Sequence, residues 1–366
     1  MKRLITLVLS LSLILTSCSG LNKAENDKPE ERKKFEHTFF DTFDTIIKYV
    51  EYDESEEEFN ENKKFVEDEF RRLHKIYDNY KSYDGINNVK TINENAGKGP
   101  IEVDEDLIDL IRFSIDCYKN ISDKTNIAMG SVLEIWSDYR EEGIEDPDKA
   151  KIPSHNELSA AKEHMDIDKI KIDKKKKTVE LEDPEMRLDL GATAKGYATE
   201  LIAQKLIEKG VDSAIISAGG NVRTIGRPKD GMRDEWGIGI QNPDNILGKS
   251  ELTVADVLYV HDTSVVTSGD YQRFYTVDGK NYHHIIDPEQ LMPMTYFRSV
   301  SVVTEDSGVA DFLSTAAFLL PFEESKKLIE SYKGAEAMWI MSDDSIEATD
   351  NLLKMMKSNG ATSKDE

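Results

Sequence analysis

The stretch LDLGATAKGYATE, residues 188–200, decides how this sequence folds around a site. An extended apolar segment runs into Gly191, and apolar residues at helical spacing then continue until Gly210. A strand that stops at glycine and opens a helix points free backbone N–H groups at one place, which suits a phosphate. Lys195 adds a cation and Asp189 a carboxylate. The stretch therefore predicts a nucleotide site with a metal.

The same residues could form an ordinary strand–turn–helix joint without any ligand. A Walker-type phosphate loop is excluded, because Lys195 precedes Gly196 and no GxxxxGK[ST] occurs in the chain. The choice between a joint and a site therefore depends on the rest of the sequence.

The composition describes a large, acidic chain. Its 366 residues are 39% hydrophobic, enough for one large domain or two closely joined ones. The formal charge of −24 at pH 7 makes nucleic acid and anionic membrane poor partners for the surface as a whole, so no nucleic-acid partner is expected. An anionic ligand has to be held locally, by helix N-termini, a few cations or a divalent ion.

The N-terminus has the pattern of an exported lipoprotein. A basic MKR start precedes an apolar run over residues 4–15 that is too short to span a membrane, and LTSC follows at 15–18. This ending resembles a bacterial lipobox, which implies cleavage before Cys18 and lipid on that thiol. We expect residues 1–17 to be a signal peptide and 18–35 a lipidated cysteine with a flexible polar tether. The protein would then lie on the extracytoplasmic face of the bacterial cell membrane, held by its lipid alone. A signal peptide with an incidental cysteine is the alternative.

The remaining pattern predicts one domain over residues 36–357 and a polar tail at 358–366. Alternating and β-branched runs indicate many strands, including a hairpin that turns at Lys174–Lys177, with a few long helices between them. Because strands and helices do not alternate regularly, we expect an α+β fold with mixed or antiparallel sheets and packed helices. Cys117 falls in a helical pattern as a buried thiol, and two cysteines exclude a disulfide framework.

A second local pattern is DFLSTAAFLLP, residues 311–321. Asp311 and Thr315 are i and i+4 on one helix, so their oxygens lie on one face. A carboxylate with a hydroxyl suits a hard cation such as Mg²⁺, which leaves most of its positions to phosphate and water. The alternative is an aspartate that stabilises the helix dipole and a threonine bonded to a backbone carbonyl.

Histidine offers no zinc site in this sequence. Only His283 and His284 are adjacent, and neither HExxH nor a GxSxG nucleophile elbow occurs. Close to Asp287, His284 could be structural or could accept a proton.

Five short motifs follow one another along the chain. They are LDLGATAKGY (188–197), AGGNVR (218–223), TSGDYQR (267–273), HIIDP (284–288) and ADFLSTA (310–316). In this order they resemble the DLGxxAKGY, GGDxR, TSGxYxR, HIIDP and ADALSTA motifs of the ApbE family of FAD:protein FMN transferases. The resemblance covers residues 38–348 and implies that family's T-fold-like architecture.

The resemblance implies roles for particular positions. Mg²⁺ would be held against the FAD diphosphate by the backbone carbonyl of Ala192, by Asp311 and by Thr315. Beyond these implied roles, we expect His284 and Asp311 to serve catalysis. The implied FAD contacts are Phe43, Tyr83, Ala128, Met129, Gly130, Asp189, Lys195, His284 and Ile285.

The implied activity is Mg²⁺-dependent transfer of FMN from FAD to a Thr or Ser hydroxyl of a client flavoprotein, with release of AMP. The family implies a respiratory or extracellular electron-transfer subunit as client. His284 or a nearby carboxylate would take the hydroxyl proton, and His284 ranks first because the free pKa of imidazole lies near working pH. The alternatives are an Mg²⁺-dependent FAD pyrophosphatase that yields FMN and AMP, and a non-enzymatic, membrane-tethered flavin carrier.

The sequence departs from the family pattern at three places. Phe43 and Asp44 replace the methionine and glycine of a TMGT motif, and EQLMP at residues 289–293 replaces RTGxP. Asn221 stands for the aspartate of GGDxR and keeps its acceptor oxygen. The role of Phe43 and the contacts of the 289–293 loop are therefore the least defined.

Overall fold

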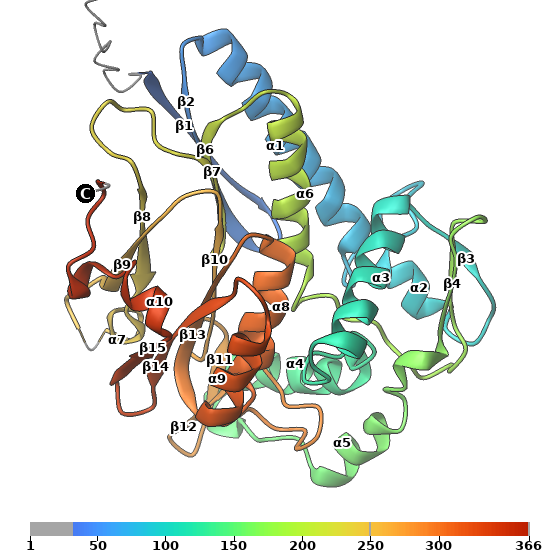
Figure 1. The fold of residues 1–366 in the computed structure, drawn as a ribbon. Coiled ribbons are helices and arrows are strands. Elements are labelled where there is room, and N and C mark those ends of the chain that lie inside the picture. Colours follow the sequence, from blue (N-terminus) through green and yellow to red (C-terminus); the bar gives the residue numbers. More distant parts are fainter. Residues whose placement is uncertain (1–31, 249, 365–366) are drawn as a thin grey trace, which may run out of the picture.

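The computed structural model describes residues 32–248 and 250–364 (Figure 1). The predicted signal peptide and Cys18 lie outside these residues. Within them, no helix has the length and apolar character needed to cross a membrane. The first strand begins at Lys33, before the predicted domain boundary at 36. At the other end, the carbonyl of Ser363 accepts the N–H groups of Asp234 and Glu235, so part of the predicted tail packs on the domain.

One eight-stranded sheet organises the fold, in the order β1-β2-β6-β7-β10-β13-β14-β15. All neighbouring strands are antiparallel. The predicted α+β class with antiparallel sheets is therefore confirmed. The strands are β1 (Lys33–Thr42), β2 (Thr45–Asp53), β6 (Ser213–Ala218), β7 (Asn221–Gly226), β10 (Ser264–Gly269), β13 (Phe297–Thr304), β14 (Glu336–Met341) and β15 (Ile346–Ala348).

Three small sheets complete the strands. A ribbon of β8 (Trp236–Gln241) and β9 (Val254–Val260) covers one face of the large sheet, where Leu258 packs with Val265 and Val303. A hairpin pairs β11 (Phe274–Val277) with β12 (Lys280–His283). The third sheet joins β3 (Ile101–Glu102), β5 (Thr178–Leu181) and β4 (Ile170–Asp173), with the predicted lysine turn between β4 and β5.

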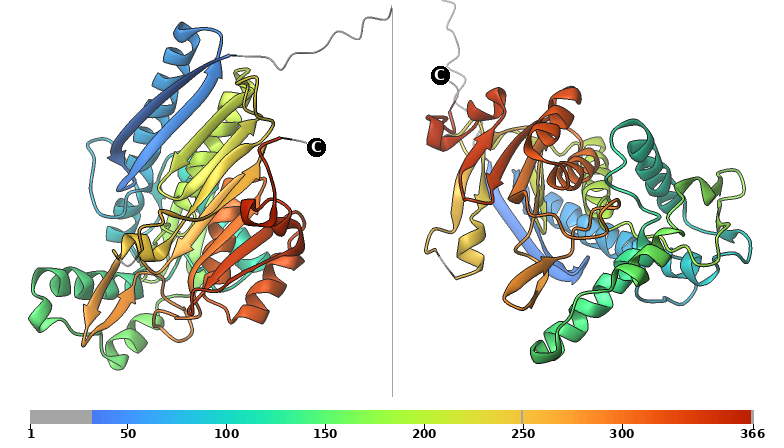
Figure 2. Two further views of the ribbon diagram at one scale, coloured as in Figure 1. Left: turned by 90° about the vertical axis from the view of Figure 1, so that its left-hand side faces the viewer. Right: turned by 90° about the horizontal axis from the view of Figure 1, so that it is seen from below.

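Helices cover the other face of the large sheet. Helices α1 (Glu56–Tyr77), α6 (Ala194–Glu208) and α8 (Ser307–Phe318) lie along it, opposite the β8–β9 ribbon (Figures 1 and 2). The acidic face of α1 is solvated and its apolar stripe is buried, as its period predicts. The other helices are α2 (Val89–Glu94), α3 (Glu105–Asn120), α4 (Gly130–Glu145), α5 (His155–Lys162), α7 (Pro243–Ile246), α9 (Phe322–Ser331) and α10 (Asp350–Leu353).

Helix α8 is apolar on almost every side, and all of its residues except Thr315 are buried. A helix of this composition needs partners on several sides, and it contacts the sheet, α6 and α9. Cys117 of α3 packs in the same hydrophobic cluster, and burial raises the pKa of its thiol to about 12. The predicted structural thiol is confirmed as buried.

The segment from Phe35 to Val50 is rich in aromatic and β-branched residues, as strands are, and it forms parts of β1 and β2. It is a hairpin, in which Phe43 and Asp44 take φ values of 52° and 50° between β1 and β2. Two-residue turns of this hand usually contain Asn, Asp or Gly, and Asp44 is one of these. Phe43 is not, so the sequence marks the turn only weakly, and the turn places the ring of Phe43 against α1.

Candidate active site

Helices α6 and α8 meet where the two predicted motifs lie. The N–H of Gly196 donates to Oδ2 of Asp311 at 2.8 Å. A Cβ on Gly196 would stand 2.2 Å from the carbonyl oxygen of Ser307, so only glycine permits this approach. The structure thereby brings together Asp311 and the stretch 188–200, which are far apart in the sequence.

Asp311 lies at the centre of this contact and is 4% exposed. Burial raises the pKa of its carboxyl, while the Lys195 ammonium and the Gly196 N–H lower it. One turn further along α8, the hydroxyl of Thr315 lies 3.2 Å from that of Ser268. Ala192 is half-buried in the turn that precedes α6. Carboxylate, hydroxyl and backbone oxygens thus come from α8, β10 and the turn before α6.

This donor set fits magnesium better than zinc. In the described part of the chain, no group of three or more His, Cys, Asp or Glu side chains could hold a metal. A single carboxylate with neutral oxygens is compatible with Mg²⁺, which takes few protein ligands when phosphate and water supply the rest. The amide of Asn221 lowers the pKa of Asp311, yet its buried nitrogen has no partner of hydrogen-bond geometry. Such a donor suits an anionic oxygen beside the carboxylate.

Asp189 fixes the turn that precedes α6. Its Oδ1 accepts the N–H of Gly191 at 2.8 Å, and its Oδ2 accepts the side-chain N–H of Asn79 at 3.2 Å. Burial raises its pKa, and these two hydrogen bonds with the Lys195 charge lower it. The predicted FAD contact thus also orders the backbone that carries Ala192.

The small residues 128–130 lie beside that turn. Ala128, Met129 and Gly130 are buried, and the carbonyl of Ile127 accepts the N–H of Asp189 at 2.9 Å. A Cβ on Gly130 would stand 2.5 Å from the carbonyl oxygen of Arg187. The residue types at 128–130 are therefore explained by close packing against the site stretch, and their contact with FAD stays a prediction.

Phe43 and Tyr83 are brought together by His74, a residue that sequence reasoning missed. The Phe43 N–H donates to Nδ1 of His74 at 3.3 Å, and the two rings are 5.6 Å apart. The Tyr83 hydroxyl donates to Asp78 at 2.7 Å and lies 3.4 Å from Nε2 of His74. Burial and the Asp78 carboxylate raise the pKa of Tyr83 to about 12, so this phenol stays neutral. No pattern in the sequence connects His74 to either residue.

His284 follows the β11–β12 hairpin, and its backbone N–H donates to the Arg273 carbonyl at 3.0 Å. Its Nδ1 is buried and has no hydrogen-bond partner. Burial and nearby positive charge lower its pKa to about 3, so the ring is neutral at working pH. The role of His284 as proton acceptor stays a prediction, and its ranking by the free pKa of imidazole has to allow for this lowered pKa. The charges responsible are Arg273, His283, Lys195 and Arg140. The adjacent Ile285 is buried in the cluster that contains α8.

Two arginines that the sequence did not single out as ligand contacts lie near His284. Most described arginines form ion pairs with carboxylates, but Arg140, Arg187 and Arg273 make none within the described residues. Arg187 donates to backbone carbonyls and Arg140 to the Ser137 hydroxyl. Arg140 lies on the face of α4 that carries Trp136 and Gly143, and these two pack on Tyr282 and Tyr275 of the β11–β12 hairpin. In so acidic a chain, two arginines without a carboxylate partner that act on the same imidazole as Lys195 favour an anionic ligand.

The chain matches known proteins over most of its length. The model of the ApbE family matches residues 43–339. A curated relative from Treponema pallidum, named FAD:protein FMN transferase, is 33% identical over 281 residues, which cover 74% of this chain and 75% of the relative. One from Klebsiella pneumoniae with the same name is 30% identical over 259 residues, 70% of this chain and 76% of the relative.

Solved structures agree with this assignment. The ApbE protein of Thermotoga maritima superposes with a TM-score of 0.75 at 26% identity, over 88% of this chain and 99% of that one. The flavin transferase ApbE of Vibrio cholerae has the same fold, with a TM-score of 0.70 at 19% identity over 87% and 97% of the two chains. Five ordered motifs, a matching family model and a shared architecture lead to one conclusion: the chain belongs to the ApbE family.

Proposed function

We propose that this protein is an FAD:protein FMN transferase that moves FMN from FAD to a Thr or Ser hydroxyl of a client flavoprotein. The observation that carries the proposal is the α6–α8 contact, where Asp311 meets the turn of residues 188–196 beside three cations. The names of the relatives support flavin transfer as the reaction class.

Magnesium is proposed to bind Asp311, the Thr315 hydroxyl and the Ala192 carbonyl. When bound, it would neutralise charge on the diphosphate during cleavage of the P–O–P bond. Lys195, Arg140 and Arg273 supply further positive charge on the protein side.

The protein's own groups then act on the acceptor hydroxyl. The hydroxyl oxygen attacks the FMN phosphorus, the P–O–P bond breaks, and AMP leaves with the bonding electrons. The hydroxyl proton passes to Nδ1 of His284, which has no competing hydrogen bond. FMN remains on the client as a phosphoester.

The location and the client belong to the same proposal. The lipobox at residues 15–18 supports a lipid anchor on Cys18 and a place on the extracytoplasmic face of the membrane. A client there would be a respiratory or extracellular electron-transfer flavoprotein.

One incubation tests the reaction. The protein is mixed with FAD, Mg²⁺ and a client flavoprotein domain, with EDTA in place of Mg²⁺ as control. Covalent flavin fluorescence on the client, with AMP in solution, is the expected result. Free FMN with AMP would identify a pyrophosphatase, and intact FAD would identify a carrier; either outcome would contradict the proposal.

A further inference from the structure

Helices α6 and α8 are joined by two reciprocal hydrogen bonds, in each of which a carboxylate of one helix accepts a backbone N–H near the N-terminus of the other. Asp311 of α8 accepts the N–H of Gly196 in the first turn of α6. In return, Glu200 of α6 accepts the N–H of Ser307, the first residue of α8, at 2.9 Å. Gly196 and Glu200 are one turn apart on α6, and so are Ser307 and Asp311 on α8. The two helices are therefore joined at two points on matching faces.

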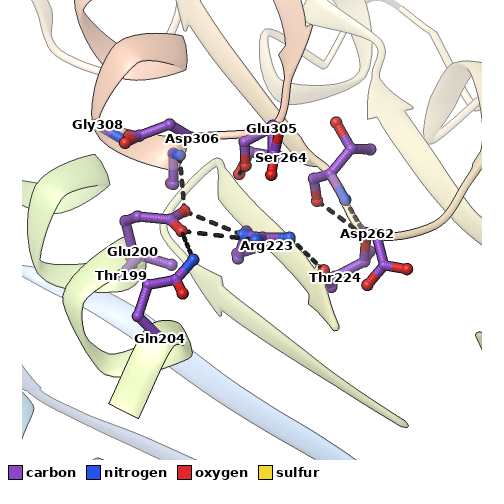
Figure 3. A network of polar contacts seen from close by, with 12 residues as sticks. Thr199, Glu200, Gln204, Arg223, Thr224, Asp262, Ser264, Glu305, Asp306 and Gly308 are labelled. Carbon is purple, nitrogen blue, oxygen red and sulfur yellow. Dashed lines mark hydrogen bonds and ion pairs between the residues drawn. The ribbon is translucent and has the colours of Figure 1, made fainter. Parts of the chain in front are cut away.

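Glu200 is held in turn by Arg223 of β7 (Figure 3). The guanidinium Nε donates to Glu200 at 2.9 Å, and Nη1 donates to the Thr224 carbonyl at 2.6 Å. Gln204 donates to the second Glu200 oxygen at 2.6 Å. Arg223 is 3% exposed and Glu200 9%, so every polar contact of this pair is made inside the protein. The pair ties both helices to the central sheet.

We propose that Glu200 and Arg223 are positioning residues for the metal site. They touch no reacting atom, but they fix α8 relative to α6 and so set where Asp311 stands against Ala192. This inference rests on the proposed function, because it assumes that Asp311 binds Mg²⁺.

The geometry explains why position matters here. Ala192 precedes α6 and Asp311 belongs to α8, so the distance between these two ligands depends on how the helices pack. A metal site tolerates shifts of only about 0.5 Å. One oxygen of Asp311 is already engaged by Gly196, so the other must be aimed by the helix itself. Residues that orient metal ligands typically contribute 10- to 100-fold to metal affinity.

The test is calorimetric titration of Mg²⁺ into protein saturated with ADP, which carries the diphosphate without flavin. Glu200→Gln keeps an acceptor for Ser307 but breaks the ion pair, and the E200Q/R223Q double variant leaves no unpaired buried charge. We expect both to bind Mg²⁺ about 10- to 100-fold more weakly, with ADP affinity in EDTA unchanged. Arg223→Lys keeps a positive charge beside Glu200 and should therefore lose less Mg²⁺ affinity than either of these variants.

The matched control is Asp256→Asn, which alters a buried carboxylate on β9 that accepts from Ser358, far from α6 and α8. It should lower the melting temperature and leave Mg²⁺ affinity intact. Wild-type affinity in the double variant, or a loss no larger than that of Asp256→Asn, would overturn the positioning role alone. Wild-type protein that binds ADP but no Mg²⁺ would overturn the proposed metal as well. If Glu200→Gln does not fold, the double variant and Arg223→Lys decide.

Discussion

The ring of His284 is neutral because it is buried among positive groups. Its basicity is therefore low for a proposed proton acceptor. With a pKa of about 3 it is a weak base in the free protein. An arriving diphosphate would cancel part of the surrounding positive charge and raise that pKa. The substrate would then activate the group that serves it.

This single residue has a testable pH signature. Because the folded pKa is far below 6.5, His284 is neutral from about pH 5 upwards, and kcat/KM should show no inflection near 6.5. His284→Ala should slow transfer by about 10²- to 10⁴-fold. Full activity of that variant would remove His284 from the mechanism. An inflection of kcat/KM near pH 6.5 that is present in the wild type and absent in His284→Ala would show that the pKa of His284 is not lowered.

Asp311 is the only charged side chain among the proposed metal ligands. Asp311→Ala should therefore abolish transfer to the client, and Asp311→Asn should retain the fold with the same loss. Covalent flavin on the client is the readout, with circular dichroism as the check on folding. Magnesium-dependent activity in either variant would show that the metal lies elsewhere.

Arg140 and Arg273, which have no carboxylate partner among the described residues, are expected to strengthen FAD binding. Arg140→Ala and Arg273→Ala should each raise the KM for FAD by about tenfold, since each removes a charged contact to an anion. Arg112→Ala is a suitable control, because Arg112 is exposed and paired with Asp109 on α3. Equal effects of all three substitutions would assign the change to net charge rather than to the site.

At the scale of elements, the site depends on the close approach of α6 to α8. Gly196→Ala should cost about 1–3 kcal/mol of unfolding free energy through overpacking, because its Cβ would meet the Ser307 carbonyl at 2.2 Å. It should also weaken Mg²⁺ binding. Gly237→Ala on β8 is the control, since its Cβ would meet neighbours only at 3.4 Å. If urea unfolding shows that Gly196→Ala and Gly237→Ala are equally stable, α6 and α8 are packed less tightly than the 2.2 Å approach indicates.

The elements also show what the sequence could and could not predict. The helix that follows Gly191 and the i, i+4 pair Asp311 and Thr315 are local patterns, so both were visible. The strand expected before Gly191 is not present, because β5 ends at Leu181 and residues 188–190 belong to no strand. Contact between those two motifs followed only from the family resemblance, because no local pattern encodes the packing of α6 on α8. The Phe43–Asp44 turn was only weakly marked, because Asp is typical of such a turn but Phe is not. His74 and the Glu200–Arg223 pair were missed because Phe43 lies 31 residues from His74 and Arg223 lies 23 residues from Glu200. Arg140 was missed because no motif includes it.

For the whole molecule, the acidic surface and the lipobox together predict where the protein resides. Cys18→Ala should move the protein from the membrane fraction to the soluble fraction, and should abolish labelling by radioactive palmitate. Activity of the released protein on a soluble client should be unchanged, since Cys18 precedes the described domain. A variant that stays in the membrane fraction would contradict anchoring through that thiol.

The two hydrogen bonds that join α6 to α8 also determine when the site can form during synthesis of the chain. Asp311 leaves the ribosome more than a hundred residues after Gly196, and β7, β10 and β13 must already be made for α8 to pack. A nascent chain that ends before residue 311 lacks Asp311 and Thr315, so it cannot complete the proposed metal site. Flavin chemistry can therefore begin only once the polypeptide is nearly complete, and a chain that crosses a membrane unfolded would be inert until it arrives.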